Sequence, residues 1–566
     1  MLILAAISIT MLAGDNSILK RVAQAKENNI IAEENEQIKL AINSSRIDEL
    51  GGNAKAKGVR SYLKSQGLNT SVYQNDDEIE IEYLDTGHKY IVKANGEIEK
   101  QEGTDTEEKN VYYKIDGTTL YLSSIKKDES YKEIEEYYYT NASEYSLPEW
   151  VGEVSTNEQG QTVFPVSSIE KAVVEDRIQP KNTSYWFYNC KQLNKIENIG
   201  RIDTRDTTKM SYMFYNCTSI ASLDVSNFNT INVTAMEGMF YNCRSLTSLD
   251  VSSFNTNNVI HMYAMFGYCF SLTSLDVSNF NTNNVTNMAG VFSNCEGLKS
   301  LNVSNFNTSK VINMGSMFYG CSSLGSLDVS SFDTSNVTNM NYMFSDCRSL
   351  TSLDVSGFNA SKVISMQNMF YGCKGLTSLN LSNFKPENAE LVNAMFNGCS
   401  GLTSIDLSNF NTKNATTMAS MFNGCLSLTS IDASAFRTGK VTTMANMFNG
   451  CTALVNLNIT SFDTSKVETM QKMFNKCSSI SVIDLSSFDT SNVTNMSSMF
   501  YNCPNLETIY ASDKWSTAKC NTTGYVFRYT TKLKGGQGTK FTNTYHGTQY
   551  ARIDGGTESP GYFTTK

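Results

Sequence analysis

The stretch MFYGCSSLGSLDVSSFDTSNVTNMNY, residues 317–342, is one unit of a repeat, because Met343 immediately begins the same phrase again. Cysteine makes the period measurable. From Cys217 to Cys503 the cysteines recur with a constant period of 26 and no insertion, and only the first step, from Cys190 to Cys217, is longer by one. Most of the chain is therefore expected to be one array in which each unit packs on its neighbours.

The composition favours a folded, polar-surfaced protein. The chain has 566 residues, of which 40% are hydrophobic and only 18% are charged, with Ser, Thr and Asn filling much of the difference. A disordered chain would be poorer in apolar residues and richer in charge. The net charge is -10, and no basic stripe or RNP-type aromatic cluster is present, so nucleic acid and anionic membranes are unfavourable partners.

Each unit carries nine apolar positions that we expect to face inward. In this unit they are Val311, Met314, Met317, Phe318, Cys321, Leu324, Leu327, Val329 and Phe332. Steps of three and four residues from 311 to 324 predict a short α- or 3₁₀-helical arc, whereas the alternation over 327–329 predicts a strand. Strands of successive units would stack in parallel, about 4.8 Å apart, into one sheet. The expected fold is an α/β repeat solenoid with one parallel sheet on its concave side.

The strand portion is similar to a leucine-rich repeat. Its L-x-x-L-x-V spacing, followed by Phe three residues later, fits that signature, and a period of 26 lies within the usual range. A column of phenylalanines takes the place of the usual asparagine ladder.

The thirteen regularly spaced cysteines share one inward column, so they are predicted to be buried free thiols. Two alternatives to free thiols remain, namely disulfides between adjacent coils and metal sites. Equivalent atoms of adjacent coils would lie about 4.8 Å apart with parallel Cβ vectors, whereas a disulfide needs Cβ atoms about 3.8 Å apart and a twisted dihedral. A metal site lacks support because no C-x-x-C occurs. Cys520 falls in the valine column of the degenerate last coil, which favours the packing interpretation.

An outward column of the predicted strands is the candidate binding row. Asn replaces Asp at every third unit from 302 onward, and the acidic members are Asp224, Asp250, Asp276, Asp328, Asp354, Asp406, Asp432 and Asp484. Two like charges about 4.8 Å apart in water cost roughly 0.9 kcal/mol. The row could bind a partner or a divalent cation such as calcium. Alternatively, each Asp accepts hydrogen bonds from nearby backbone or Ser groups and solvates the face.

The N-terminal part differs from the array. Residues 1–43 are expected to form a helix, and MLAGDNSILKRVAQAKE resembles the second half of a prepilin-type N-terminal helix, whose upstream anchor half we expect to be missing from this sequence. The opening apolar run is too short to span a membrane. Residues 44–100 read as a small antiparallel α+β module with a turn at Asn95-Gly96, and residues 101–110 read as a linker. Together these segments resemble a pilin-like module.

The remaining boundaries follow the repeat. Residues 111–183 are assigned to a β-hairpin lead-in and N-terminal cap, 184–534 to the repeats, and 535–566 to a C-terminal cap. A cap is expected because the open end of a stacked array exposes apolar surface. Tyr185 and Trp186 are candidate cap residues.

No catalytic residue, cofactor site or metal site is predicted. Catalysis needs unlike ionisable groups that converge, whereas a periodic array places like residues in rows. The histidines His88, His261 and His546 are scattered, and His261 is expected to be a solvent-exposed substitution. A deep pocket with unlike ionisable residues would count against this interpretation.

The repeats resemble the BspA-like leucine-rich repeat proteins of bacterial surfaces. The resemblance rests on SYWFYNC, DTSNVTNMSSMFYNC, LTSLDVSNFNT and the terminal ARIDGGTESPGYFTTK, and it covers residues 112–566. It implies a secreted or surface-displayed, non-enzymatic protein that adheres to a host or bacterial protein or glycan. The alternatives are a minor pilin-like structural subunit or spacer and, more weakly, a carbohydrate-active enzyme. With no LPxTG-like signal, attachment is expected through the N-terminal helix.

Overall fold

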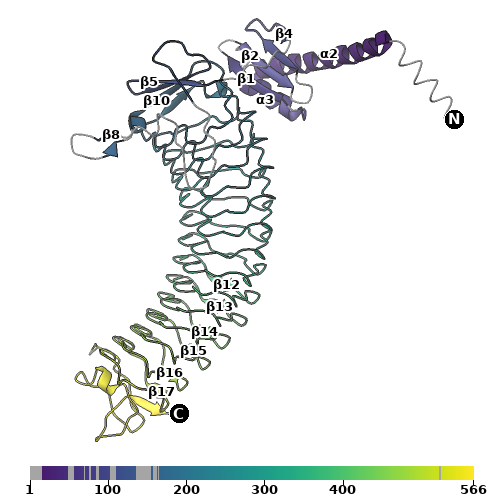
Figure 1. Cartoon of the computed structure of the whole chain (residues 1–566). Coiled ribbons are helices and arrows are strands. Elements are labelled where there is room, and N and C mark those ends of the chain that lie inside the picture. Colours follow the sequence, from purple (N-terminus) through teal and green to yellow (C-terminus); the bar gives the residue numbers. More distant parts are fainter. Residues whose placement is uncertain are drawn as a thin grey trace, which may run out of the picture.

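The computed structural model shows a small N-terminal module followed by a long, curved stack of coils (Figure 1). It describes residues 16–48, 56–68, 70–75, 78–83, 88–101, 110–134, 155–156, 162–163, 165–521 and 524–566. Most of the predicted linker at 101–110, and the apolar run that opens the predicted N-terminal helix, lie outside the described residues. The chain is mostly β and turn, with few helices.

The N-terminal module packs two helices on one antiparallel sheet. The helices are α2 (Asn16–Asp48) and α3 (Ala56–Ser65), and the sheet order is β1 (Thr70–Asn75), β2 (Glu78–Tyr83), β3 (Lys89–Val92) and β4 (Ile98–Gln101). Helix α2 covers residues 16–43 of the predicted helix and continues to Asp48, beyond the predicted end, and a turn is present at Gly96, which has a φ of 88°. Helix α3 was not predicted; its buried Val59 and Leu63 lie one helical turn apart and pack into the module's own core. Among the described residues, no helix is both long and apolar enough to span a bilayer.

The lead-in to the array is a mixed five-stranded sheet. Its strands are β5 (Tyr112–Asp116), β6 (Thr119–Ser123), β7 (Lys132–Glu133), β10 (Lys171–Val174) and β11 (Lys195–Glu197), in the order β11-β10-β6-β5-β7. A separate short pair joins β8 (Ser155–Thr156) to β9 (Thr162–Val163), and single 3₁₀ turns occur at η1 (Pro165–Ser168) and η2 (Ile199–Arg201). Tyr185 and Trp186 are buried, and Trp186 belongs to the same core as the sheet and the first coils.

The arc of each coil consists of successive β-turns, so the predicted α- or 3₁₀-helical arc is wrong. Met317 N–H donates to Met314 O at 3.2 Å, Tyr319 N–H to Ser316 O at 3.1 Å, and Cys321 N–H to Phe318 O at 3.1 Å. Ser316 and Gly320 have φ values of 56° and 71°. A right-handed helix needs negative φ at every residue, and two left-handed residues in each coil therefore exclude it.

The turns are tied to the next coil by an alternating backbone ladder. The N–H groups of residues 314, 316, 318 and 320 donate to the carbonyls of residues 339, 341, 343 and 345 at 3.0, 2.8, 2.9 and 2.8 Å. A parallel bridge between Asn313 and Asn339 starts this ladder, and equivalent bridges run from Asn182 to Asn495. The longest continuous backbone pairing between coils therefore lies on the turn segment, not on the predicted strand.

The predicted strand segment forms several small parallel sheets instead of one. The strands are β12 (Ser378–Asn380), β13 (Ser404–Asp406), β14 (Ser430–Asp432), β15 (Asn456–Asn458), β16 (Val482–Leu485), β17 (Thr508–Ala511) and β18 (Phe563–Thr565), paired as β12-β13, β14-β15 and β16-β17-β18. In earlier coils the same segment is joined by fewer bonds, such as Thr273 N–H to Thr247 O at 3.2 Å. A last 3₁₀ turn, η3 (Thr548–Tyr550), lies in the C-terminal segment.

The nine inward columns are confirmed as the core. In the unit around Phe318 every one of the nine side chains is at most 7% exposed. The Phe318 ring stacks on Phe292 and Phe344 with centroid distances of 5.8 and 5.7 Å. Burying a large apolar side chain contributes about 1.5 to 3 kcal/mol, so each added coil extends a continuous apolar core that no disulfide needs to support.

The prediction of free thiols is also confirmed. All fourteen cysteines are unpaired, and the thirteen in the column are buried. Cys321 Sγ donates to Phe292 O at 3.1 Å. The thiol thus packs as a small apolar side chain and also serves as a weak hydrogen-bond donor. Cys520 is half-buried, and its Sγ lies 3.4 Å from the carbonyl of Val493, as expected for a residue in the valine column.

A thiol-labelling experiment checks this arrangement. Burial raises the pKa of Cys321 to about 12, so the column thiols are both inaccessible and protonated at pH 8. We expect a thiol reagent to label only Cys520 in the native chain and all fourteen cysteines after unfolding without reductant. Cys520→Val, which restores the column residue, should abolish the native signal. Fewer than fourteen thiols in the unfolded chain would contradict the free-thiol assignment.

The left-handed position before each cysteine gives a second test. Gly424 has a φ of 73°, and a Cβ there would meet Gly398 Cα at an ordinary 3.6 Å, so the cost of a side chain is conformational. We expect Gly424→Ala to lower the free energy of unfolding in urea by about 1 to 2 kcal/mol. Gly424→Asn should cost less, because Asn294 holds the equivalent position with a φ of 55°. An alanine variant as stable as the parent would contradict this account.

Candidate functional site

The predicted acidic row lies at the surface, where its members make regular local hydrogen bonds. Seven of the eight carboxylates are exposed and Asp484 is partly buried. The Oδ1 atom of each accepts from the backbone N–H of the Ser two residues later; the Ser N to Asp Oδ1 distance is 2.9 Å at Asp328 and 3.1 Å at Asp224. Asn302 makes the same bond to Ser304 N at 3.1 Å, which explains why Asn can replace Asp. The interpretation that each Asp accepts hydrogen bonds from nearby backbone or Ser groups thus has a direct structural basis.

The hydrogen bonds also lower the pKa of Asp276, Asp328 and Asp354. Hydrogen bonding by the side chain and backbone of Ser330 holds the pKa of Asp328 below its ordinary value of 3.8, and equivalent serines do the same for Asp276 and Asp354. Within the described residues, no three His, Cys, Asp or Glu side chains gather as a metal-binding group. The row therefore presents single, turn-stabilised carboxylates at the coil spacing, and cation binding there stays a hypothesis.

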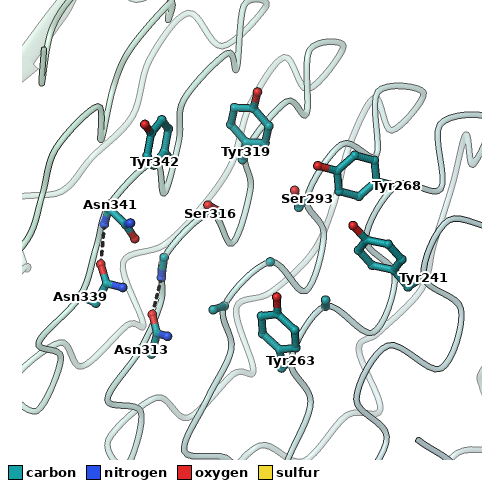
Figure 2. A pocket seen from close by; sticks show the side chains of 14 residues that line it. Tyr241, Tyr263, Tyr268, Ser293, Asn313, Ser316, Tyr319, Asn339, Asn341 and Tyr342 are labelled. Atoms are coloured by element: carbon teal, nitrogen blue, oxygen red, sulfur yellow. Dashed lines mark hydrogen bonds between the residues drawn. The ribbon is translucent and has the colours of Figure 1, made fainter. Parts of the chain in front are cut away.

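A groove on the turn side of the array is a second candidate site that the sequence analysis did not identify. It has a volume of about 390 Å³ and spans five successive coils. Figure 2 shows the rings and amides that surround it, with two serines between them. The lining residues are Tyr241, Tyr263, Ala264, Tyr268, Ala289, Gly290, Ser293, Asn313, Gly315, Ser316, Tyr319, Asn339, Asn341 and Tyr342.

The groove exists because three successive coils carry small residues in one column of its lining. The column lies five positions before each cysteine, where Ala264, Gly290 and Ser316 line the groove. Short side chains in three successive coils leave the hollow.

A second column, two positions before each cysteine, places rings beside the hollow. Tyr241 and Tyr319 line the groove in this column, and the short Ser293 lies in a coil between them. Gly267 of the same column does not line the groove. A Cβ on Gly267 would lie only 2.9 Å from the Tyr241 ring, so glycine permits the position of that ring.

Tyr268 is a second departure from the pattern. It has a φ of 62° at a position where most coils carry Asn or Gly. Left-handed tyrosines also occur outside the groove, at Tyr185, Tyr212 and Tyr529, so the conformation alone does not mark the site. The strained position is held by a 2.6 Å hydrogen bond from Tyr268 N–H to Ser293 O, and the ring lies 5.0 Å from Tyr241 between centroids. The coil thus places an additional ring beside the hollow.

Three asparagines supply polar groups at one end of the groove (Figure 2). Asn313 Oδ1 accepts from Gly315 N at 3.0 Å, and Asn339 Oδ1 accepts from Asn341 N at 3.0 Å. Because the carbonyl oxygens make these turn bonds, the amide NH₂ groups are the parts that can meet a ligand. A Cβ on Gly315 would lie 2.3 Å from Asn341 Oδ1, so glycine at this position makes room for the Asn341 amide.

The groove is suited to binding and has no acid-base pair. None of its lining residues is Asp, Glu, Lys, Arg or His. Burial raises the pKa of Tyr241 and of Tyr319, so these hydroxyls are neutral at physiological pH. Neutral hydroxyl and amide groups can orient a ligand, whereas catalysis needs convergent ionisable groups.

The histidines stay apart in the structure. His88 Nδ1 lies 2.6 Å from Glu34 Oε2 inside the N-terminal module, and His546 Nδ1 lies 2.6 Å from Asn543 O. The His261 side chain is 53% exposed, as expected from the sequence, and lies 3.8 Å from Glu237. The groove lining does not include any of them.

The acidic row gives a pH prediction. Since hydrogen bonding lowers the folded-state pKa of Asp276, Asp328 and Asp354, the stability that these three contribute is present above the ordinary value of 3.8 and is lost as pH falls through the lower folded values. We expect the triple variant Asp276→Asn, Asp328→Asn, Asp354→Asn to fold and to lose less stability on acidification than the parent, measured by thermal unfolding from pH 7 downward. Identical acid sensitivity of the two chains would contradict the assignment.

Comparison with known proteins places the chain in a family. Residues 181–301, 269–377, 350–435 and 427–539 match the family described as Mycoplasma protein of unknown function, DUF285. Residues 112–239 match the BspA type leucine rich repeat region. No curated protein matches the chain. The predicted BspA-like resemblance is thus confirmed for residues 112–239, whereas the rest of the predicted range to 566 has no BspA-type match and the prepilin-like N-terminus gains no support. Since the first set of matches covers more than half of its length, the chain belongs to the DUF285 family and carries BspA-type repeats at the start of its array.

Proposed function

We propose that this chain is a non-enzymatic bacterial cell-surface protein that binds a protein or glycan through a continuous leucine-rich solenoid. The observation that carries the proposal is the groove between Tyr241 and Tyr342, the place where outward columns change while the buried columns stay regular. A core that repeats without interruption allows surface residues to vary from coil to coil. Families of this kind are typically non-enzymatic repeat proteins of molecular interaction, and BspA-type proteins are typically surface or extracellular.

The acidic row offers a second surface for a partner. Its exposed carboxylates recur at the coil spacing, so a partner with repeated basic or hydroxyl groups could contact several coils at once. Such extended contact suits a repeat scaffold. The N-terminal helix is the proposed route of attachment to the cell.

A structural role as a spacer or minor pilin-like subunit is the second candidate. It is favoured by the way the N-terminal module joins the first coils. Arg177 donates to Asp203 Oδ2 at 2.8 Å and is also paired with Glu80 of β2, and Arg60 of α3 donates to Ser226 Oγ at 2.9 Å. Tyr73 of β1 donates to Asp203 Oδ1 at 2.5 Å within the same contact. This network would hold the module and array in a defined orientation, as a projecting spacer requires.

A binding screen separates the two roles. We expect the full chain to bind saturably to at least one component of an array of cell-surface glycans, extracellular-matrix proteins and purified pilins, with glycans left chemically intact. The triple Asp→Asn variant of the acidic row shows whether that surface takes part.

Binding only to pilins, abolished by Arg177→Ala with Arg60→Ala but not by changes in the array, would instead establish the spacer role. Shortening of any glycan during incubation would support the carbohydrate-active enzyme and overturn the non-enzymatic proposal.

A further inference from the structure

We propose that the tyrosine-lined groove is the binding site for a neutral oligosaccharide. This inference rests on the proposed function, because it names the ligand class of the groove that supports it. The groove volume of about 390 Å³ falls within the range of small-molecule sites. Five aromatic rings and three amides converge on it from five successive coils (Figure 2).

The rings supply apolar faces around a floor of small residues. Tyr241 and Tyr268 lie 5.0 Å apart between centroids, and Tyr319 and Tyr342 lie 6.1 Å apart with their planes at 87°. Between these pairs the surface is formed by Gly290, Ser293, Ser316 and similar short side chains. A sugar ring carries apolar C–H faces and a rim of hydroxyl groups, so tyrosine matches it with an apolar face and a polar tip.

The polar groups match sugar hydroxyls in type. A hydroxyl group donates one hydrogen bond and accepts others, so it can pair both with the NH₂ of Asn313 or Asn339 and with a tyrosine hydroxyl. The Oδ1 atoms of both asparagines are held by Gly315 N and Asn341 N, which fixes the direction of the amides before a ligand arrives. Such preorganisation lowers the entropic cost of binding.

Charge selects a neutral ligand. No acidic or basic side chain lines the groove, so a carboxylated or sulfated sugar would lose its hydration without gaining a charged partner. The net charge of the whole chain, -10, also disfavours an anionic ligand.

The backbone of the groove argues against an extended peptide as the occupant. Ala264 N–H donates to Ala289 O at 2.9 Å, Gly290 N–H to Gly315 O at 2.9 Å, and Ser316 N–H to Asn341 O at 2.8 Å. These bonds join one coil to the next, so the floor offers no unpaired edge for strand addition. A peptide would have to satisfy its own amides through side chains alone. A proline-rich peptide is the remaining competitor, since aromatic grooves also bind such segments.

The test uses the full chain and three matched variants. Tyr319→Ala removes one ring, and Ser293→Tyr fills the hollow with the residue that Tyr241 and Tyr319 place in the same column. Tyr371→Ala is the control, because Tyr371 belongs to that column two coils further on and does not line the groove. Calorimetry with cellohexaose, chitohexaose, maltohexaose, a mannan oligosaccharide, sialyllactose and poly-L-proline measures binding, and thermal unfolding confirms that each variant folds.

We expect saturable binding of at least one neutral oligosaccharide, weakened about tenfold or more by Tyr319→Ala and by Ser293→Tyr and unchanged by Tyr371→Ala. Binding of poly-L-proline or sialyllactose alone, equal binding by all variants, or no binding of any of these probes would overturn the inference. If Ser293→Tyr still bound the oligosaccharides that the parent chain binds, the groove assignment would fail while the proposed surface-binding function stood. If the parent chain bound no component of the broader screen, the proposed surface-binding function would itself be overturned.

Discussion

The structure depends on the alternating hydrogen bonds that tie the turn segment of each coil to the next. Donors at every second residue, such as Met314, Ser316 and Phe318, reach backbone carbonyls of the coil that follows. This ladder fixes the distance between coils, and the stacked Phe column and the cysteine column follow from that distance. The ladder requires a left-handed residue at two positions per coil, which explains the recurrence of Gly and Asn just before the cysteine.

The period and the inward columns could be predicted because apolar residues recur at fixed positions whatever the backbone does between them. The conformation of the arc could not be predicted from the same spacing. A helix and a series of overlapping turns both bring residues three and four apart to one side, so Met314, Met317 and Cys321 fit either. The deciding signal was the residue type at the outward position of Gly320, where Gly or Asn recurs and a helix would favour neither. Helix α3 was missed for a different reason: ten residues carry only a short amphipathic pattern.

The two candidate surfaces differ in what a repeat sequence can reveal. The acidic row was easy to find because it recurs, and the same recurrence has a structural cause, since each Oδ1 stabilises its own turn through a Ser N–H. The groove was invisible to an analysis of columns because it consists of exceptions to them. The run of small residues at 264, 290 and 316, in a column that holds Tyr at 212 and 342, would have indicated it, had departures from the columns been read alongside the consensus.

The groove lies among coils that have a neighbour on both sides. A terminal coil has one neighbour, whereas a central coil is held by ladders and stacked rings on both sides. The coil of Tyr268 is held in this way, because Phe266 stacks on Phe240 and Phe292 with centroid distances of 5.7 and 5.9 Å. The strain at Tyr268 is local, and the support for it comes from the neighbouring coils. A regular core thus allows one irregular surface, and that surface is where selective recognition can reside.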